Sequence, residues 1–295
     1  MDLAKKATII ALICAFFLAF VKFIAGILSG SVAVLASAID SMIDFAISAF
    51  NFLALKKSSS KPNTRYNFGF SKIEALAGFV EGCFIFAVGI FIFYQSVLKI
   101  YHNESVDDLN LGVGVMIFAL ILTFLLVLYL SHVAKKTKSL VVESDCLHYK
   151  SDLLSNALTL LALALIHFTH WHIIDAIFGI AVSFYTAYSA FGIVKKSLSF
   201  LMDKALDDEQ IGRIKELIES HKEVISFHHL KTRKTPSTNY VSLHLVFCPI
   251  ISLLNAHRIS DEIEEGIRAL CKDEKWELQI HLDPYDDQEE ERKRL

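Results

Sequence analysis

The sequence lacks three features that would point to common classes of protein. It has no large excess of charge of one sign, since 29 Lys and Arg stand against 32 Asp and Glu and leave a net charge of −3, so we expect no nucleic-acid partner. Its five cysteines are scattered and none belongs to a CxxC pair, which argues against a disulfide framework and against a thiolate metal site. The apolar start of the chain lacks a convincing small-residue cleavage site, so we interpret it as a retained membrane span.

Hydrophobic residues, in contrast, are abundant. They make up 54% of the 295 residues, and the mean hydropathy is +0.45, which would leave too much apolar surface in water for a soluble protein. Most of them lie between residues 7 and about 200, whereas the rest of the chain is densely charged. We therefore predict a membrane domain over 1–200, a soluble domain over 201–287 and a charged tail over 288–295.

Six apolar runs in the first domain are long enough to be membrane spans. A span needs about 20 apolar residues to cross a hydrocarbon core about 30 Å thick, and it must be helical because lipid offers the backbone no hydrogen-bond partners. We predict six transmembrane helices, at about 7–29, 31–55, 75–98, 110–132, 142–167 and 173–195.

Lys and Arg gather on one side of these spans. They occupy the N-terminus, the loops after the second and fourth spans, and the segment after the sixth: Lys5, Lys6, Lys56, Lys57, Lys61, Arg65, Lys72, Lys135, Lys136, Lys138, Lys195 and Lys196. The positive-inside rule then places both termini in the cytoplasm. Lys22 lies inside the first span, and we expect its side chain to snorkel to the interface.

The pattern after residue 203 predicts a small α+β domain. Segments 207–221 and 253–271 have the spacing of amphipathic helices, and segments 224–233, 240–247 and 276–284 alternate like strands. The predicted order is αββαβ, which makes a compact cytoplasmic domain of three strands covered by two helices.

Two carboxylates interrupt the second span. Asp40 and Asp44, in the stretch AIDSMIDF, are four residues apart and so share one face of the helix. Each ionised carboxylate at mid-helix costs about 2.5–3.5 kcal/mol on insertion scales, and the two repel each other. Such a costly pair indicates a functional site.

The fifth span holds a second pair with the same spacing. His148 and Asp152 are also four residues apart, so two helices can bring four ligands to one point. Three carboxylates and one imidazole suit a divalent ion in tetrahedral geometry, zinc above all. The charge of the ion would explain how the carboxylates stay ionised among apolar helices.

Histidines are concentrated in the soluble domain, at His228, His229, His244, His257 and His281. Histidine is a common zinc ligand. His281 and Asp283 are two residues apart, which places them on one face of a predicted strand. These residues predict a second metal site, with ordinary surface histidines as the alternative.

Together these motifs resemble those of the cation diffusion facilitator family. The resemblance rests on DxxxD in the second of six spans, HxxxD in the fifth, and the αββαβ domain that follows. It is supported by the stretches SGSVAVLASAIDSMID, FGFSKIEALAGF, HYKSDLLSN, LMDKALDDEQ, HHLKTRK, VSLHLVF, AHRISDEIE and IHLDP. The similarity extends over nearly the whole chain.

The resemblance implies a secondary active transporter and not an enzyme. Members export divalent metal from the cytoplasm in exchange for protons and act as homodimers. Their transport site matches four residues of this chain: Asp40, Asp44, His148 and Asp152. In the close bacterial relatives a cytoplasmic metal site bridges the two protomers, and its ligands match His228, His244, His257, His281 and Asp283. For this chain we expect zinc in that site.

The chain departs from these relatives in the loop that enters the third span. The relatives carry an Asp and two His there, where this chain has Asn63, Tyr66 and Phe70. None of the three is a good zinc ligand, so we expect no metal site in this loop. The His-rich loop of many eukaryotic zinc members, between spans four and five, is also missing, which indicates a bacterial protein of the cytoplasmic (inner) membrane.

Other functions fit the residues less well. An intramembrane aspartyl protease needs its two aspartates on two helices, and an intramembrane metalloprotease needs HExxH, which is absent. Four tight ligands would hold an ion too long for the rapid conduction of a channel. A membrane metal sensor without transport remains the alternative. Cadmium, iron, cobalt, nickel and manganese remain alternatives to zinc, since geometry and availability set selectivity more than raw affinity.

Overall fold

A computed structural model describes the chain except for residues 1–2, 30–31, 103–112, 170–172, 272–273 and 287–295. The chain divides into two compact units, residues 1–198 and 199–295, and each is described by itself. The predicted charged tail lies outside the described residues.

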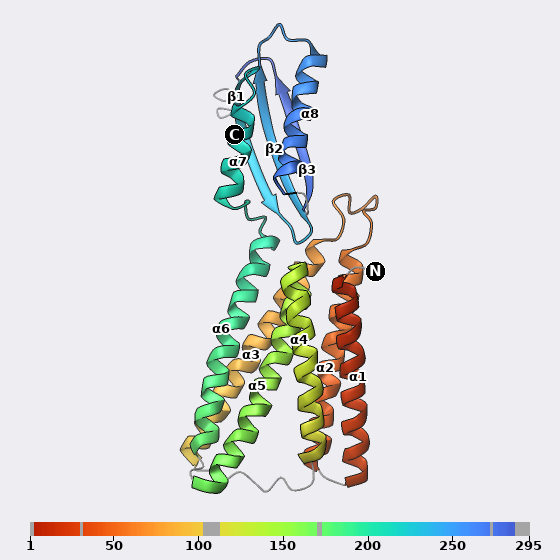
Figure 1. Cartoon of the computed structure of the whole chain (residues 1–295), viewed down its shortest axis with the longest axis vertical. Coiled ribbons are helices and arrows are strands. Elements are labelled where there is room, and N and C mark those ends of the chain that lie inside the picture. Colours follow the sequence, from red (N-terminus) through yellow and green to blue (C-terminus); the bar gives the residue numbers. More distant parts are fainter. Residues whose placement is uncertain (1–2, 30–31, 103–112, 170–172, 272–273, 287–295) are drawn as a thin grey trace. The chain divides into compact units, whose positions relative to one another are not determined.

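The first unit contains six long helices, which lie side by side (Figure 1). Their bounds are α1 Leu3–Ser29, α2 Val32–Ser58, α3 Lys72–His102, α4 Val113–Thr137, α5 Leu140–Thr169 and α6 Ile173–Leu201. Each helix overlaps most of one predicted span, so the six-helix prediction is confirmed. Most helices run a few residues past the apolar stretch, because lysines such as Lys56 and Lys135 continue the last turn.

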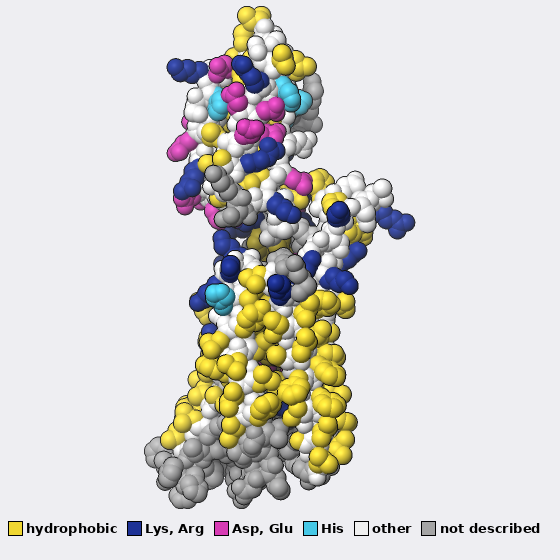
Figure 2. Space-filling model, turned by 45° about the vertical axis from the view of Figure 1, so that its right-hand side comes forward, with side chains coloured by type: hydrophobic (Ala, Val, Ile, Leu, Met, Phe, Trp, Pro, Cys, Tyr) yellow, Lys and Arg dark blue, Asp and Glu magenta, His cyan; other side chains and the backbone are white. Residues whose placement is uncertain are grey.

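The surface of this unit is largely apolar. Within the described residues, α1, α2, α3, α4 and α6 each contain a stretch long and apolar enough to cross a membrane. Hydrophobic side chains cover the outside of the helices in Figure 2, as expected of a surface that faces lipid. Lys and Arg gather at one end of the unit (Figure 2).

Small residues let neighbouring helices approach each other closely, as is common in membranes. Ala54 of α2, Ala77 of α3 and Val141 of α5 form one buried cluster. A Cβ atom added to Gly89 of α3 would lie only 3.1 Å from the backbone nitrogen of Ala187 on α6. The first contact joins α2, α3 and α5, and the second joins α3 and α6.

The second unit has the predicted αββαβ order. Its elements are α7 Asp208–Glu219, β1 Val224–Lys234, β2 Thr238–Phe247, α8 Leu253–Leu270 and β3 Lys275–Asp283. The sheet order is β1-β2-β3, with β1 antiparallel and β3 parallel to β2. The two parallel strands need a long crossover, which α8 provides.

The two helices and the sheet share one apolar core. Ile214 of α7 and Ile263 of α8 pack with Leu243 and Leu245 of β2. Successive side chains of a strand point to opposite faces, so His244, between these leucines, lies on the sheet face away from the core. The alternation of β2 thus separates the core from the histidines.

A bulge in β1 lies beside these histidines. The pairing of β1 with β2 shifts register between His228 and Lys231, and His229 has a φ of 51°, in the left-handed region that is uncommon for residues with a side chain. Bulges change the direction of side chains. The His229 ring centre consequently lies 4.8 Å from that of His228 and 5.4 Å from that of His244.

Candidate metal centre

Two helices bring three of the predicted ligands together in the first unit. Asp44 lies on α2, and His148 and Asp152 lie one turn apart on α5. One ligand atom of each lies within 4.8 Å of the others. Nε2 of His148 is 3.0 Å from Oδ1 of Asp44 and 3.6 Å from Oδ2 of Asp152.

These distances fit a tetrahedral zinc ion. Zinc bonds to nitrogen and oxygen are about 2.0–2.2 Å long, so ligand atoms at tetrahedral corners lie about 3.4 Å apart. The two measured distances, 3.0 and 3.6 Å, lie on either side of this value. The side chain of His148 is 11% exposed and that of Asp152 39%, so the group is recessed but accessible to an ion.

Asp40 stands apart from this group. It lies one turn before Asp44 on α2 and is exposed, and the group of three does not include it. The structure therefore brings together three of the four predicted ligands. A tetrahedral ion needs a fourth, which a rotation of the Asp40 side chain or a water molecule could supply.

Lys22 of α1 differs from the prediction that it snorkels to the interface. Its Nζ donates a hydrogen bond of 2.8 Å to Oγ of Ser41, a buried residue next to Asp40. The ammonium charge interacts with Asp44, Asp152 and Asp40. The attraction of these groups holds the side chain inside the bundle.

Glu81 and Asp145 are buried polar residues to which the sequence analysis assigns no role. Glu81 has no acidic residue or histidine three or four positions away. Asp145 lies one turn before His148, but this spacing does not indicate its contact with α2. Their partners come from other helices: Asn51 of α2 hydrogen-bonds both. Such contacts depend on how the helices pack.

The second unit holds a second group of metal-ligating residues. His228 of β1, His244 of β2 and Asp283 of β3 each offer one atom within 4.8 Å of the others. Oδ2 of Asp283 is 2.9 Å from Nδ1 of His244 and 3.3 Å from Nε2 of His228. The register explains the group, because His228 pairs with His244 and His244 pairs with His281 across the sheet.

His281 lies with this group, whereas His257 does not. Nε2 of His281 is 3.0 Å from Oδ1 of Asp283, and its ring centre is 4.7 Å from that of His244. His257 lies on the exposed side of α8, with its Nε2 3.6 Å from Oδ2 of Asp261. Asp261 was not predicted as a partner, although its spacing of four from His257 is visible in the sequence.

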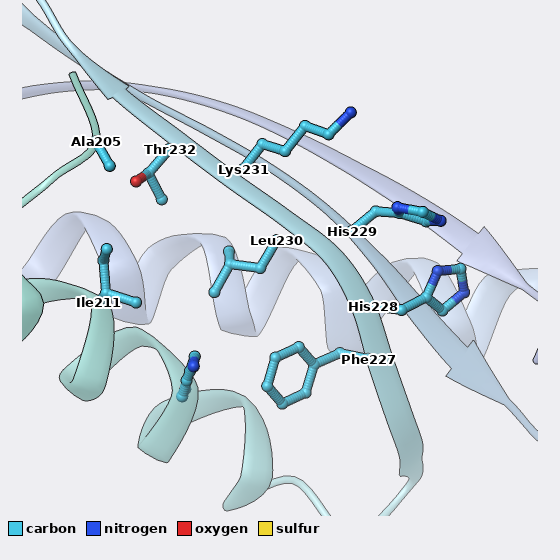
Figure 3. Close-up of a pocket in the computed structure, with 9 residues that line it drawn as sticks. Ala205, Ile211, Phe227, His228, His229, Leu230, Lys231 and Thr232 are labelled. Carbon is cyan, nitrogen blue, oxygen red and sulfur yellow. The ribbon is translucent and has the colours of Figure 1, made fainter. Parts of the chain in front are cut away.

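A cavity of about 500 Å³ lies along β1, next to α7. It is lined by Ala205, Ile211, Lys215 and residues 227–232. Phe227 and Leu230 point toward α7, whereas His228 and His229 lie on the opposite side of the strand (Figure 3). His228 lines the cavity and also belongs to the metal-ligating group, so the two adjoin each other at this residue.

The loop between α2 and α3 is held by hydrogen bonds and aromatic contacts. Oδ1 of Asn63 accepts hydrogen bonds from the backbone N–H groups of Arg65 and Tyr66. The rings of Tyr66 and Phe70 are 5.0 Å apart, and Nζ of Lys57 lies 4.1 Å from the centre of the Phe70 ring. Asn63, Tyr66 and Phe70, where we expect no metal site, thus contact other groups of the loop and of α2.

Comparisons with known proteins cover both units. The family model described as "Cation efflux transmembrane domain" matches residues 8–202, and "Cation efflux protein, cytoplasmic domain" matches residues 206–285. The cation-efflux pumps FieF of Salmonella paratyphi A and Salmonella agona are each 33% identical over 282 residues, 96% of this chain and 93% of the relative. A solved structure, the metal-bound C-terminal domain of the CzcD transporter from Thermotoga maritima, covers 26% of this chain and 87% of its own length, with 18% identity and a TM-score of 0.24.

The two family matches follow each other in the order of the two structural units and together span most of the chain. The matched relatives align over nearly their whole length. The chain therefore belongs to the cation efflux (cation diffusion facilitator) family and is a multi-pass membrane transporter of metal cations.

Proposed function

We propose that this chain exports a divalent metal ion, zinc first of all, from the cytoplasm in exchange for protons. The observation that carries the proposal is the group of Asp44, His148 and Asp152, which presents two carboxylates and an imidazole at tetrahedral spacing from two membrane helices. Ionisable groups inside a membrane domain typically mark an ion pathway. Oxygen and nitrogen donors suit zinc and also accept other divalent ions.

Protons and metal would compete for the same atoms. Metal binding needs a neutral imidazole and ionised carboxylates, so protons that enter from the outer side would release the metal. Histidine is the side chain whose ordinary titration range lies nearest neutral pH, and we therefore propose His148 as a proton carrier. Rocking of the helices around the site would open it to one side at a time.

The second unit would be a zinc-binding cytoplasmic domain that joins two protomers. Asp283 contacts three histidines there, and the exposed His257 could add a ligand to the same ion or to one shared with a partner chain. Lys and Arg at one end of the first unit support an orientation with both termini in the cytoplasm, across a bacterial inner membrane.

Zinc flux into sealed proteoliposomes tests the transport proposal. A lumen more acidic than the medium should accelerate zinc uptake, because protons then leave in exchange for the metal. A protonophore should remove this acceleration. A zinc flux that does not change with the pH gradient would indicate a uniporter. The absence of flux for every divalent ion would favour a metal sensor.

Substitutions locate the site in the same assay. Asp44→Ala and Asp152→Ala should each reduce zinc flux to the level of empty liposomes, since either change removes a ligand, while the purified protein elutes like the wild type. His132→Ala is the matched control, because His132 is an exposed histidine of α4. Flux within about twofold of wild type in either aspartate variant, a difference of less than about 0.5 kcal/mol, would show that this group is not the transport site.

A further inference from the structure

A second polar group lies next to the metal ligands in the first unit. It consists of Asn51 on α2, Glu81 on α3, and Ser144 and Asp145 on α5. All four side chains are buried, with exposed fractions between 0% and 3%. Asp145 precedes His148 by one helical turn, so the group is close to the metal site without being part of it.

The amide of Asn51 joins the two carboxyl groups. Its Nδ2 donates hydrogen bonds of 3.1 Å to Oε1 of Glu81 and 3.2 Å to Oδ1 of Asp145. The hydroxyl of Ser144 donates to Oε2 of Glu81. Both carboxyl oxygens of Glu81 therefore accept a hydrogen bond. Of the two carboxyl oxygens of Asp145, only Oδ1 accepts one.

Two buried oxygen atoms of this group have no hydrogen-bond partner in the part of the chain that the structure describes. They are Oδ2 of Asp145 and Oδ1 of Asn51. Buried polar atoms are nearly always paired, because an unmade hydrogen bond leaves the cost of desolvation uncompensated. Both atoms are acceptors, so the missing partner carries a hydrogen or a positive charge.

The negative charge of the group is not balanced by a direct ion pair among the described residues. Among the described residues, no Lys, Arg or His forms an ion pair with Glu81 or Asp145. The titratable groups that interact with the pair electrostatically are Asp44, His148 and Tyr149. Two buried carboxylates linked through one amide repel each other and are desolvated, and such a pair tends to retain one proton.

We propose that Glu81 and Asp145 form a proton-binding pair that holds one proton at neutral pH, apart from the metal ligands. Oδ2 of Asp145 is the atom with room for that proton, because the other three carboxyl oxygens already accept hydrogen bonds. Asn51 and Ser144 stabilise the negative charge that remains on the pair. A metal ion fits less well, because the amide hydrogens of Asn51 point to both carboxyl groups and would repel it.

Infrared spectroscopy of the full-length protein in lipid tests the pair without any measurement of transport. We expect a C=O stretching band of a protonated carboxyl group at neutral pH, which shifts in D₂O. Asp145→Asn removes the group that carries the proton, and Glu81→Gln removes the second anion, so Asp145 can ionise. The band should disappear in both variants.

Glu143→Gln is the matched control. Glu143 is another carboxylate of α5, and its Oε2 pairs with Lys196 at 2.5 Å, outside the polar group. This variant should keep the band. If Asp145→Asn and Glu81→Gln both retain the band, the band belongs to another residue and the proposal is refuted.

Two further outcomes would overturn the assignment. If the wild-type protein shows no such band, both carboxyl groups are ionised, and this result does not depend on the folding of any variant. If equilibrium dialysis against zinc or manganese shows that Glu81→Gln loses one bound ion per protomer while the wild type lacks the band, the pair holds metal. Because neither measurement uses flux, the outcome is independent of whether the chain exports zinc.

Discussion

Lys22 places a positive charge among the acidic residues of the first unit. Its Nζ bonds to Ser41, and its charge acts on Asp44 and Asp152. A fixed cation near two carboxylates stabilises their ionised form when no metal is bound, and it repels a metal ion that arrives. The charge of Lys22 should therefore weaken metal binding and help release.

Lys22→Met should tighten zinc binding. Methionine has a similar length but no charge, so the substitution removes the repulsion while filling much of the same space. The expected decrease in Kd is on the order of tenfold, which corresponds to about 1.4 kcal/mol and is modest for charges in a poorly hydrated site. Competition with a fluorescent zinc indicator, in detergent at constant pH, measures it.

Two variants separate the charge of Lys22 from its hydrogen bond. Lys22→Arg keeps the cation and should bind zinc like the wild type, and Ser41→Ala removes the acceptor but not the charge. An unchanged or larger Kd in Lys22→Met would show that the ammonium group does not act on the metal site.

Residue spacing in the sequence predicted some of the metal ligands, because residues close together on one helix have a fixed arrangement. Residues four apart share a helix face however the helices pack, so His148 and Asp152 could be identified as neighbours from the sequence. The network of Asn51, Glu81 and Asp145 could not be, because its hydrogen bonds join residues 30 and 94 positions apart. The same holds for Lys22, whose partner lies on the neighbouring helix.

At the scale of elements, α3 and α6 depend on a glycine for their close approach. Gly89→Ala should push these helices apart, because the new Cβ atom would lie 3.1 Å from the backbone nitrogen of Ala187 and 3.3 Å from the carbonyl oxygen of Ser183. Backbone atoms of a helix cannot move aside as a side chain can. Overpacking of this kind costs about 1–3 kcal/mol, so we expect a lower midpoint of thermal unfolding in detergent.

Gly192→Ala is the control for this change. Gly192 lies on α6, and a Cβ atom there would have nothing within 4 Å. The midpoint should stay the same or rise, because alanine favours a helix over glycine by about 1 kcal/mol. Equal midpoints for the two alanine variants would mean that the contact at Gly89 is not tight.

The hydrophobic pattern predicted the helices and strands, but it did not predict the bulge in β1. Long apolar runs fix membrane helices because the backbone has no alternative in lipid, and alternation located the strands that pack on α7 and α8. The bulge in β1 was not predictable, because it depends on register with β2 and on the left-handed conformation of His229. That bulge decides how the rings of His228 and His229 lie.

At the scale of the whole molecule, each unit has its own buried core. The core of the second unit is formed by residues of α7, α8 and the sheet together with Leu206 and Ile251, so this unit should fold by itself. Its metal-ligating group lies on the sheet face away from that core, and the His281 side chain is 66% exposed. An ion bound there remains open to ligands from a second chain.

Zinc should therefore strengthen association of the isolated segment 203–286. An ion that binds only the dimer stabilises it by mass action, by about 2.7 kcal/mol at a hundredfold excess over Kd. Sedimentation equilibrium with and without zinc measures the shift. Asp283→Ala should abolish it, because this carboxylate contacts three histidines. His221→Ala, two residues after the end of α7, should not. A zinc-insensitive monomer would show that the ion, if bound, does not bridge two chains.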